Sequence, residues 1–306
     1  MDNNIYDIWG EALKFSEARR AAIGVCRAEP FLDCLPELAA ARTPFVRFSP
    51  EERIDPALCL PGCKSVIAAA VPVGRIKPPR PDYPHGEFSL LSALRDYHLT
   101  VAEFLEDLAG FLGRRLAFSR KIFVDTGNLP EKEVLYRAGL AARGRSGLAL
   151  SPEFGSRFNA GVMLTDIDFG DAAANQPPEN HGFCASCGLC EKSCPTGAIG
   201  ERFDPYKCVS YLTQKKGALT EAERAAMGAN LYGCDACADV CPLNSRQNGG
   251  VIATGEIYPS AEAVEDMTRL DKTAFAERYK ERVFFYKGIA HFRRNAEIVL
   301  RNIRQV

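Results

Sequence analysis

Eight cysteines between residues 184 and 241 have the spacing that could hold iron–sulfur clusters. The stretch CASCGLCEKSCP contains a C-x2-C-x2-C-x3-C-P run. In such a run three cysteines bind corners of one [4Fe–4S] cube, and the fourth, followed by proline, points toward a second cube. A shorter run, CDACADVCP, has its own C-x3-C-P step and lacks one cysteine, which Cys208 in KCVSYL can supply. The spacing predicts two [4Fe–4S] clusters that pass electrons one at a time.

This exchange of the fourth ligand divides the eight thiolates into two sets. The first set, for one cluster, is Cys184, Cys187, Cys190 and Cys241. The second set, for the other cluster, is Cys194, Cys208, Cys234 and Cys237. Zinc also takes four thiolates, but zinc sites pair two C-x2-C knuckles and do not need a triplet with an outward fourth cysteine.

Four more cysteines lie outside these runs: Cys26, Cys34, Cys59 and Cys63. The stretch CLPGC has the wrong spacing for a cubane loop. Because free cysteine is common in the cores of α/β proteins, we expect these four to be packing thiols.

The N-terminal segment MDNNIYDIWGEALKFSEARR has acidic residues where a secretory signal would be positively charged, and no apolar segment follows it. The longest apolar stretch, VIAAAVPV, is far shorter than the roughly 20 residues that a membrane-spanning helix needs. We therefore expect a soluble, cytoplasmic, monomeric protein with no membrane contact. In that reducing compartment metal binding is the expected use of the cysteines.

The composition is that of an ordinary globular protein, with 306 residues of which 46% are hydrophobic and 25% charged. A formal net charge of −1 gives no overall attraction to nucleic acid. Charge is uneven, however, because residues 280–306 carry seven basic side chains against two acidic ones. This basic tail predicts either a phosphate-binding face or a solvated helix surface.

The elements before the cysteines alternate between helical and extended patterns, which favours an α/β (α+β) domain. We expect strands at 21–26, 65–73, 121–127 and 161–169, and helices at 11–22, 29–41 and 88–113. A proline-rich loop, IKPPRPDYPHGE, separates the second strand from the longest helix and is the best candidate for a ligand-covering segment.

Composition changes at GDAAANQPPENHG, a plausible linker from 170 to 182. We expect an α/β domain over 1–172, a ferredoxin-like two-cluster module over 180–248, and a helical basic segment over 255–306. Two nearby clusters pass electrons one at a time, and these electrons need an acceptor. The α/β domain must therefore hold a redox cofactor or a surface on which a redox partner docks. It contains no G-x-G-x-x-G and no G-x-x-x-x-G-K-[ST]. A corrin-ligating histidine at His98 is discounted, because Val101 stands where a D-x-H-x-x-G motif has glycine.

Four stretches together resemble the epoxyqueuosine reductase family, cobalamin-dependent enzymes that complete queuosine in tRNA anticodons. They are RDYH; VDTGNLPEKEVLYRAGL with ALSPEFGS and VMLTD; the cluster segment with KCVSYLTQKKG and NLYGCDACADVCPLN; and HFRRNAEIVLRN. The match covers most of residues 60–306. The implied fold is a cobalamin-binding α/β domain fused to a two-[4Fe–4S] module with a helical C-terminal segment, an arrangement that reductive dehalogenases share.

The resemblance also implies roles for individual residues. Asp125 matches the proposed proton donor of the family in VDTG, although an aspartate that organises the turn would look the same in sequence. Cofactor contacts are implied, beside helix-surface or turn roles, for Tyr97, His98, Gly139, Ser151, Pro152 and Gly155. Lys287, Arg293 and Arg294 would contact phosphates of a tRNA substrate. An external flavodoxin-type or ferredoxin-type donor would reduce the clusters, which pass electrons to a base-off cobalamin that reduces the epoxide.

The chain departs from the family pattern where cofactor and substrate would lie. It reads AGLAARGRS, with Arg143, Arg145 and Ser146 where the family has an aromatic residue and a lysine, and FNAGVM where the family has a glutamate. Arg143 and Arg145 could bind a phosphate or carboxylate, or cap a solvated turn. The alternatives left open are a corrinoid reductase of a small molecule, a two-cluster electron carrier without corrinoid, and a flavin in the α/β domain.

Overall fold

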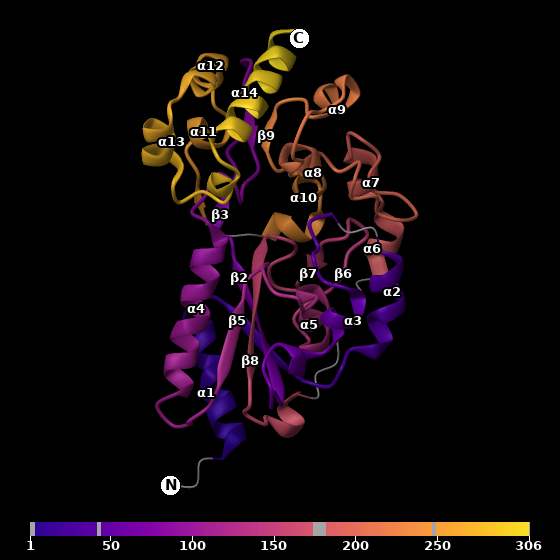
Figure 1. Cartoon of the computed structure of the whole chain (residues 1–306), viewed down its shortest axis with the longest axis vertical. Helices are drawn as coiled ribbons and strands as arrows, with labels where there is room; N and C mark the ends of the chain where they lie inside the picture. Colours follow the sequence, from indigo (N-terminus) through magenta and orange to yellow (C-terminus); the bar gives the residue numbers. More distant parts are fainter. Residues whose placement is uncertain (1–3, 42–43, 174–181, 247–248, 306) are drawn as a thin grey trace. The chain divides into compact units, whose positions relative to one another are not determined.

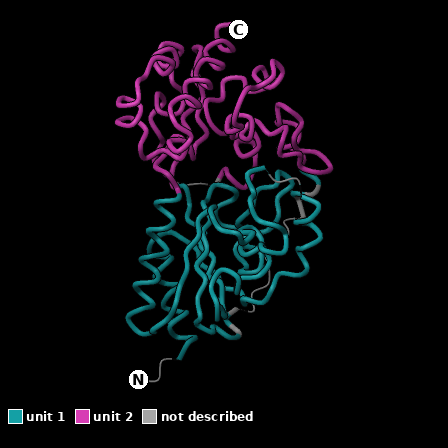
Figure 2. The backbone as a smooth tube through the Cα atoms, in the orientation of Figure 1, with its two compact units in different colours: residues 1–73, 98–187 teal, residues 74–97, 188–306 magenta. Residues whose placement is uncertain are grey.

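The computed structural model describes residues 4–41, 44–173, 182–246 and 249–305. The chain divides into two compact units (Figure 2). Unit 1 comprises residues 1–73 and 98–187, and unit 2 comprises 74–97 and 188–306. The segments expected at 180–248 and 255–306 therefore share one unit from residue 188 onward, and the proline-rich loop belongs to that unit as well. Most of the expected linker, at 174–181, lies outside the described residues.

Unit 1 is built on a four-stranded antiparallel sheet in the order β1-β2-β8-β5. The strands are β1 (Ala22–Arg27), β2 (Ser65–Pro72), β5 (Arg120–Phe123) and β8 (Phe158–Thr165). β2 is central and its first six residues are buried, because SVIAAAVP is apolar on both faces. In register, Val66 pairs with Leu164 and Pro72 pairs with Phe158.

Helices cover both faces of this sheet (Figure 1). On one face, α5 (Glu131–Arg137) packs with Val134 and Leu135 against the cluster that includes Val66 and Val162. On the other face, α4 (Tyr97–Leu112) lies so close that a Cβ at Gly161 would be 2.5 Å from Val101. The mixed α/β architecture expected from the sequence is confirmed for this unit.

The remaining elements of unit 1 are short. They are α1 (Ile5–Glu17), η1 (Leu32–Cys34), α2 (Leu35–Ala40), α3 (Pro50–Ile54), η2 (Pro56–Leu58), β6 (Ala142–Arg143), β7 (Ala149–Leu150), η3 (Gly170–Ala173) and α6 (Gly182–Cys187). Three of the four extra cysteines, Cys26, Cys34 and Cys59, are buried in the core of this unit. Burial raises the pKa of Cys26 to about 12 and also raises the pKa of the other three, as expected of packing thiols.

Unit 2 is mostly helical, with two pairs of short parallel strands. Its elements are β3 (Arg75–Ile76), β4 (Glu87–Phe88), α7 (Leu189–Ser193), α8 (Val209–Gln214), α9 (Glu221–Ala226), β9 (Asn230–Tyr232), α10 (Ala236–Asp239), η4 (Pro242–Arg246), β10 (Gly250–Val251), α11 (Thr254–Ile257), α12 (Ala261–Arg269), α13 (Lys272–Tyr279), η5 (Phe285–Lys287) and α14 (Ile289–Arg304). β3 pairs with β10 and β4 pairs with β9. Stacked rings of Phe88, Phe284 and Phe292 join β4 to the C-terminal helices. Among the described residues, no helix has both the length and the apolar character needed to cross a membrane.

The helix expected over 88–113 was wrong in its first third, because α4 begins only at Tyr97. Phe88 instead pairs in β4 with Tyr232. The Ser92 hydroxyl donates to the backbone oxygens of Ser89 and Tyr232, both at 2.9 Å, and the Leu90 N–H donates to Asp235 at 2.7 Å. Serine hydroxyls compete for backbone partners in this way, so contacts distant in sequence override the apolar periodicity.

Candidate functional site

The first three cysteines of the long run lie on two short helices. Cys184 and Cys187 are on α6 at i, i+3, which places them on one face of that helix. Gly188 has a φ of 65°, a left-handed conformation that ends α6 and starts α7, on which Cys190 lies. The seven cysteines of the two runs and Cys208 are half-buried, and none of them forms a disulfide. The chain thus presents these thiols for metal binding rather than as disulfides.

The second set of cysteines is brought together within unit 2. Burial raises the pKa of Cys234 to about 11, and the charge of Cys208 adds to the increase. Burial likewise raises the pKa of Cys237 to about 12, with contributions from Cys234 and Cys208. The pKa of Cys208 is raised by burial and by Cys194. Thiols affect each other's ionisation only when they are close, so Cys208 lies near Cys194, Cys234 and Cys237. Cys190, assigned to the first cluster, also contributes to the raised pKa of Cys237.

Cys194 lies in a different environment from the other three. Burial tends to raise its pKa, but backbone N–H groups of Thr196, Ile199 and Ala198 outweigh burial and lower it. The turn that presents them contains Gly197 with a φ of 61°. Hydrogen bonds to sulfur of this kind stabilise a thiolate and are one of the means by which proteins tune iron–sulfur clusters.

The thiols of the second set therefore fit a cubane cluster, and the spacing of Cys184, Cys187 and Cys190 fits a second one. Within the described part of the chain, no three His, Cys, Asp or Glu side chains are close enough together to hold a single metal ion. The fit depends on the thiol spacing, on the four gathered cysteines and on the N–H groups around Cys194. Packing of α7 against α10, where the Ser193 hydroxyl donates to the Ala236 oxygen at 3.1 Å, keeps the two runs side by side.

In unit 1, Asp125 follows β5 by two residues and is exposed. Its φ of 54° is left-handed, a conformation that aspartate tolerates better than most residues. The backbone N–H of Asp125 donates to Oε1 of Glu131 at 2.6 Å. The first turn of α5 thus fixes the backbone that presents the Asp125 carboxyl.

Glu131 is the residue at this site that sequence reasoning missed. It is partly buried, and burial raises its pKa to about 8, with the Asp125 N–H opposing the increase and the Asp125 charge adding to it. Glu131 is therefore protonated near neutral pH, so a proton lies beside Asp125. The only signal in the sequence was an acidic residue at the start of a predicted helix, six residues after Asp125. An acidic residue is common there because it interacts favourably with the helix N-terminus, so the position did not point to a role at the site.

We expect the change Glu131→Gln to stabilise the protein at and above neutral pH. Between pH about 4.5 and about 8, Glu131 is protonated in the folded chain and ionised in the unfolded chain. Folding then takes up a proton, so the free energy of unfolding falls as pH rises through this window. Glutamine keeps the oxygen that accepts the Asp125 N–H and removes this loss, worth on the order of 2 kcal/mol at pH 7.

The measurement is the thermal midpoint of both proteins from pH 5 to pH 9. The advantage of the glutamine variant should be small at pH 5, grow to pH 8 and then level off. A difference that stays constant across pH would contradict a protonated Glu131.

The antiparallel register brings a second group of predicted residues to the sheet edge that carries Asp125. β5 ends, β2 ends and β8 begins at this edge, since Phe123 pairs with Val162 and Pro72 with Phe158. The loop just before β8 is closed by two hydrogen bonds between Ser151 and Gly155, of 2.8 and 3.0 Å. Asp125 and this loop, including the exposed Pro152, thus share one edge of unit 1.

Other residues predicted as cofactor contacts have structural roles in turns or at helix ends. Gly139 has a φ of 73° after α5 and Gly155 a φ of 55° in its loop, so both positions favour glycine for backbone reasons. Tyr97 and His98 are half-buried in the first turn of α4, where the division between the two units falls. Their contacts with a cofactor stay predictions.

Two family models match the chain. The model described as "Epoxyqueuosine reductase QueG, DUF1730" matches residues 53–126, and the one described as "4Fe-4S double cluster binding domain" matches residues 183–244. An epoxyqueuosine reductase of Bacillus cereus is 34% identical over 266 residues, which is 83% of this chain and 68% of the relative. The chain belongs to the epoxyqueuosine reductase family.

Solved structures of the family have the same fold. A crystal structure of epoxyqueuosine reductase with an epoxyqueuosine-modified tRNA-Tyr stem loop superposes with a TM-score of 0.89 at 28% identity, covering 98% of this chain and 83% of that chain. A Bacillus subtilis structure, with an aspartate catalytic loop swung out of the active site, gives a TM-score of 0.85 at 27% identity over 99% and 83% of the two chains. The fold and the two-cluster module expected from the sequence are confirmed.

The three basic residues predicted as phosphate contacts donate to backbone oxygens within unit 2. Arg294 bonds to the oxygens of Lys215 and Gly217 at 2.7 and 2.8 Å, Lys287 bonds to the oxygen of Gln214 at 3.2 Å, and Arg293 bonds to the oxygen of Leu270. Every nitrogen of the Arg294 guanidinium has a partner in unit 2, because Nε and the second terminal nitrogen also donate to Asn295 at 3.1 and 2.8 Å. A phosphate role for the three residues stays a prediction.

The HFRRN stretch of α14 also joins this helix to α8 and β9 through buried hydrogen bonds. Asn295 is buried and its amide donates to the oxygens of Thr213 and Leu231 at 2.8 and 2.9 Å. His291 lies 2.7 Å from the Thr213 oxygen, and burial lowers the pKa of its imidazole to about 4. His291, Arg294 and Asn295 are spaced at i, i+3 and i+4, so they lie on one face of the helix. This spacing was the signal in the sequence that the three side chains act together. This face holds α8, whose first turn begins just after Cys208, the predicted cluster ligand.

Proposed function

We propose that this protein reduces epoxyqueuosine to queuosine in tRNA, using two [4Fe–4S] clusters and a cobalamin held by unit 1. The observation that carries the proposal is that one chain contains both the two-cluster domain and the DUF1730 region, which includes Asp125. Relatives at 34% identity carry the name of this activity. The site in unit 1 offers an exposed carboxyl, and the clusters offer electrons.

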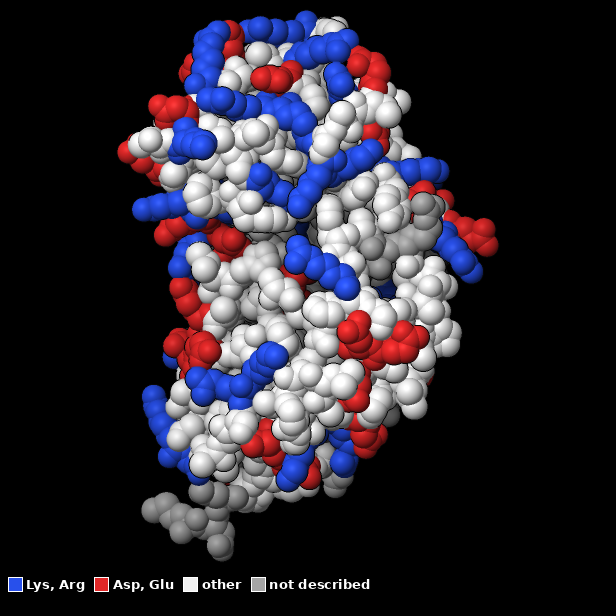
Figure 3. Space-filling model, in the orientation of Figure 1, with Lys and Arg blue, Asp and Glu red and all other residues white. Residues whose placement is uncertain are grey.

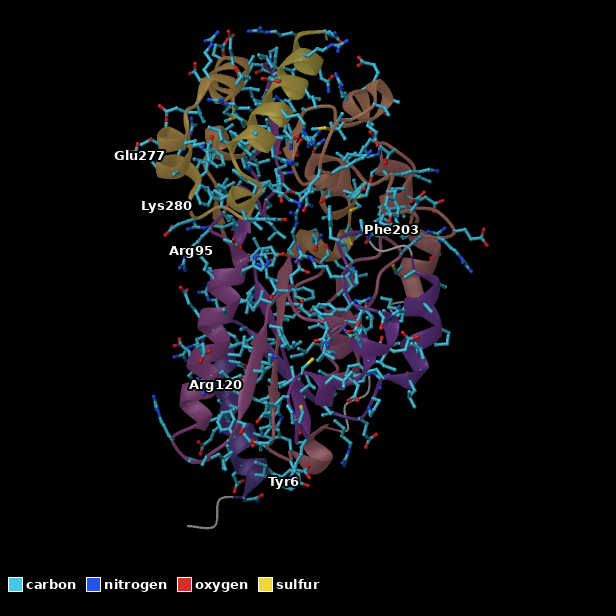
Figure 4. The ribbon with its side chains drawn as sticks, viewed as in Figure 1. Tyr6, Arg95, Arg120, Phe203, Glu277 and Lys280 are labelled. Atoms are coloured by element: carbon cyan, nitrogen blue, oxygen red, sulfur yellow. The ribbon has the colours of Figure 1, made fainter. Side chains whose placement is uncertain are left out.

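The two clusters would carry electrons from an external donor of flavodoxin or ferredoxin type, and the chain would act as a monomer. Cys184, Cys187, Cys190 and Cys241 would hold one cluster, and the gathered second set would hold the other. Two large apolar side chains next to predicted ligands in the chain are exposed, Leu189 before Cys190 and Val240 before Cys241. Phe203 of the same unit is exposed as well (Figure 4). Exposed apolar residues next to a redox centre favour docking of a partner protein.

Cobalamin, when bound, would supply the reduced cobalt that attacks the epoxide. The sheet edge with Asp125 and the Ser151–Gly155 loop fits such a group, because its turns are made of small or turn-forming residues beside an exposed carboxyl. Asp125 would deliver the proton to the departing oxygen of the epoxide. Its backbone, fixed by Glu131, would keep that carboxyl in place during turnover.

The substrate would be recognised through the phosphates of the tRNA stem loop. Figure 3 shows Lys and Arg side chains gathered over unit 2 on the face that it draws. Among the basic side chains of unit 2 are Arg301 and Arg304 of α14, each with a side chain 55% exposed and ion-paired to a glutamate. Arg95 of the RDYH stretch and Lys280 also project from unit 2 (Figure 4), where the Asp96 N–H donates to the Glu281 oxygen at 2.7 Å. Binding that depends on such contacts weakens steeply with salt.

The departures from the family pattern at 143–146 do not by themselves require another substrate. Arg143 forms ion pairs with Glu37 and, at 2.8 Å, with Glu133, so it joins α2 and α5 within unit 1. Two carboxylates already neutralise this arginine. A substrate anion is not needed to explain it.

The experiment is anaerobic turnover with cluster-replete protein, cobalamin, a chemical reductant and a tRNA stem loop that carries epoxyqueuosine. We expect cobalamin to bind with a base-off cobalt(II) paramagnetic signal, and queuosine to form in a cobalamin-dependent way. Cobalamin binding without stem-loop turnover or affinity would favour a corrinoid reductase of a small molecule. No cobalamin binding at micromolar concentration would leave a two-cluster electron carrier.

A further inference from the structure

A lysine with three carboxylates is buried in unit 2. The Lys77 ammonium lies 2.8 Å from Glu87, 2.8 Å from Asp239 and 3.3 Å from Asp235. The side chains of Lys77, Glu87 and Asp235 are 9%, 6% and 10% exposed, and that of Asp239 is 30% exposed. Arg80, which is 60% exposed, adds a second ion pair to Glu87 at 2.8 Å. The five groups carry one net negative charge.

The backbone of unit 2 holds this network in place. Lys77 follows β3, which pairs with β10, and Glu87 is in β4, which pairs with β9. Asp235 also accepts the Leu90 N–H at 2.7 Å. The network thus joins the segment 74–97 to the turn and helix that carry the second run of cysteines.

Lys77 keeps its positive charge in this environment. Burial tends to lower the pKa of Lys77, but Asp235, Glu87 and Asp239 outweigh burial and raise it above its usual value. A lysine in contact with three carboxylates keeps its proton across the physiological range. The network is therefore a fixed set of charges rather than a titrating switch.

These charges stand beside cluster ligands. Asp235 lies between Cys234 and Cys237 in the chain, and Asp239 lies between Cys237 and Cys241. The Lys77 ammonium lies 3.3 Å from Asp235 and 2.8 Å from Asp239, and each of these carboxylates is within two residues of a predicted ligand, so the charges of the network lie close to the cluster. A positive charge among them would favour the reduced cluster, which carries one more electron.

We propose that Lys77 sets the reduction potential of the cluster held by Cys194, Cys208, Cys234 and Cys237, by offsetting the carboxylates beside its ligands. The proposal deepens the proposed function, because it rests on the two-cluster assignment, but it does not depend on the substrate. A buried ion pair is weak support for stability, since desolvation cancels much of the Coulomb attraction. A role for the network in electron transfer explains why the chain buries a charge at this position.

The test is a potentiometric titration of cluster-replete, full-length protein, followed by paramagnetic resonance without tRNA or cobalamin. Lys77→Met should shift the potential of this cluster downward, and Glu87→Gln should shift it upward. A tenfold change in the ratio of oxidised to reduced cluster at fixed applied potential, which is 59 mV for a one-electron couple, is the size we look for. The cluster is identified as the signal that Cys208→Ala removes.

Two controls separate charge from structure. Lys77→Arg keeps the charge and should leave the potential near that of the wild type. Arg301→Met removes an exposed charge on α14 that is paired with Glu221 at 2.8 Å, and should also leave it unchanged. If Lys77→Met fails to load both clusters, Glu87→Gln, which keeps shape and packing, still tests the proposal.

Shifts of Lys77→Met and Glu87→Gln in the same direction, or no shift in either, would overturn the proposal while leaving the two-cluster assignment intact. Failure of the stem-loop turnover assay would leave the potentials, and hence this inference, unaffected. The two failures are therefore distinguishable.

Discussion

Replacing Cys208 with alanine is expected to remove one of the two clusters and to abolish reductase turnover. Cys208 is the N-cap residue of α8 and stands outside both cysteine runs. Its pKa is nevertheless raised by Cys194, after burial, and Cys208 in turn contributes to the raised pKa of Cys234 and of Cys237. Without it the second set has three ligands, too few for a stable cubane. Iron content should fall from about eight to about four atoms per chain.

The matched control is Cys63→Ala. Cys63 is a half-buried thiol of unit 1 that donates to the Ser65 oxygen at 3.4 Å and lies outside both runs. The variant loses the same atoms, and we expect it to retain about eight irons. Iron and sulfide analysis with paramagnetic resonance gives the result. Full iron in Cys208→Ala, or equal losses in both variants, would show that the eight ligands are assigned wrongly.

The cluster module could be predicted from sequence because its ligands follow one another at short, fixed steps. A cubane accepts three thiolates from a loop of seven residues, so the run from Cys184 to Cys190 is determined by local geometry alone. β2 was predicted equally well, because SVIAAAVP is a central strand that is buried at its first six residues. Both inferences depend on residues close together in the chain.

Features that depend on residues far apart could not be predicted in this way. The start of α4 was placed nine residues too early, since the hydrogen bond from Leu90 to Asp235 joins positions 145 residues apart. The network of Lys77 with Asp239 spans 162 residues and left no local pattern. Arg294 was predicted as a phosphate contact because its charge is visible in sequence, whereas its backbone acceptors at Lys215 and Gly217 are not.

The candidate site of unit 1 falls between these two cases. Asp125 was predicted from resemblance, but its left-handed backbone and its contact with Glu131 appear only in the fold. The resemblance assigned the proton donor to Asp125. In the structure burial raises the pKa of Glu131, six residues later. A pair of carboxyl groups in which the more buried one, here Glu131, holds the proton is a common arrangement for proton delivery.

We expect Asp125→Asn to lower kcat by about 10²–10⁴-fold, the usual contribution of a positioned general acid. Asparagine tolerates the left-handed φ of 54° and keeps the backbone N–H that donates to Glu131, so the loop should keep its shape. The control is Asp168→Asn, an exposed aspartate of the same unit whose carboxylate accepts the Gly170 N–H at 2.9 Å. Its kcat should stay within about twofold of the wild type.

The division of the effect between kcat and KM shows whether Asp125 acts on the proton or on binding. If it delivers a proton in the transition state, kcat falls while stem-loop affinity and cobalamin binding stay the same. An increase in KM at constant kcat would instead make Asp125 a binding residue. Glu131→Gln tests the source of the proton, because it removes the acidic proton of Glu131 and leaves the Asp125 carboxyl and backbone in place. If Asp125→Asn keeps full kcat and Glu131→Gln loses it, the proton comes from Glu131 and Asp125 only shapes the loop.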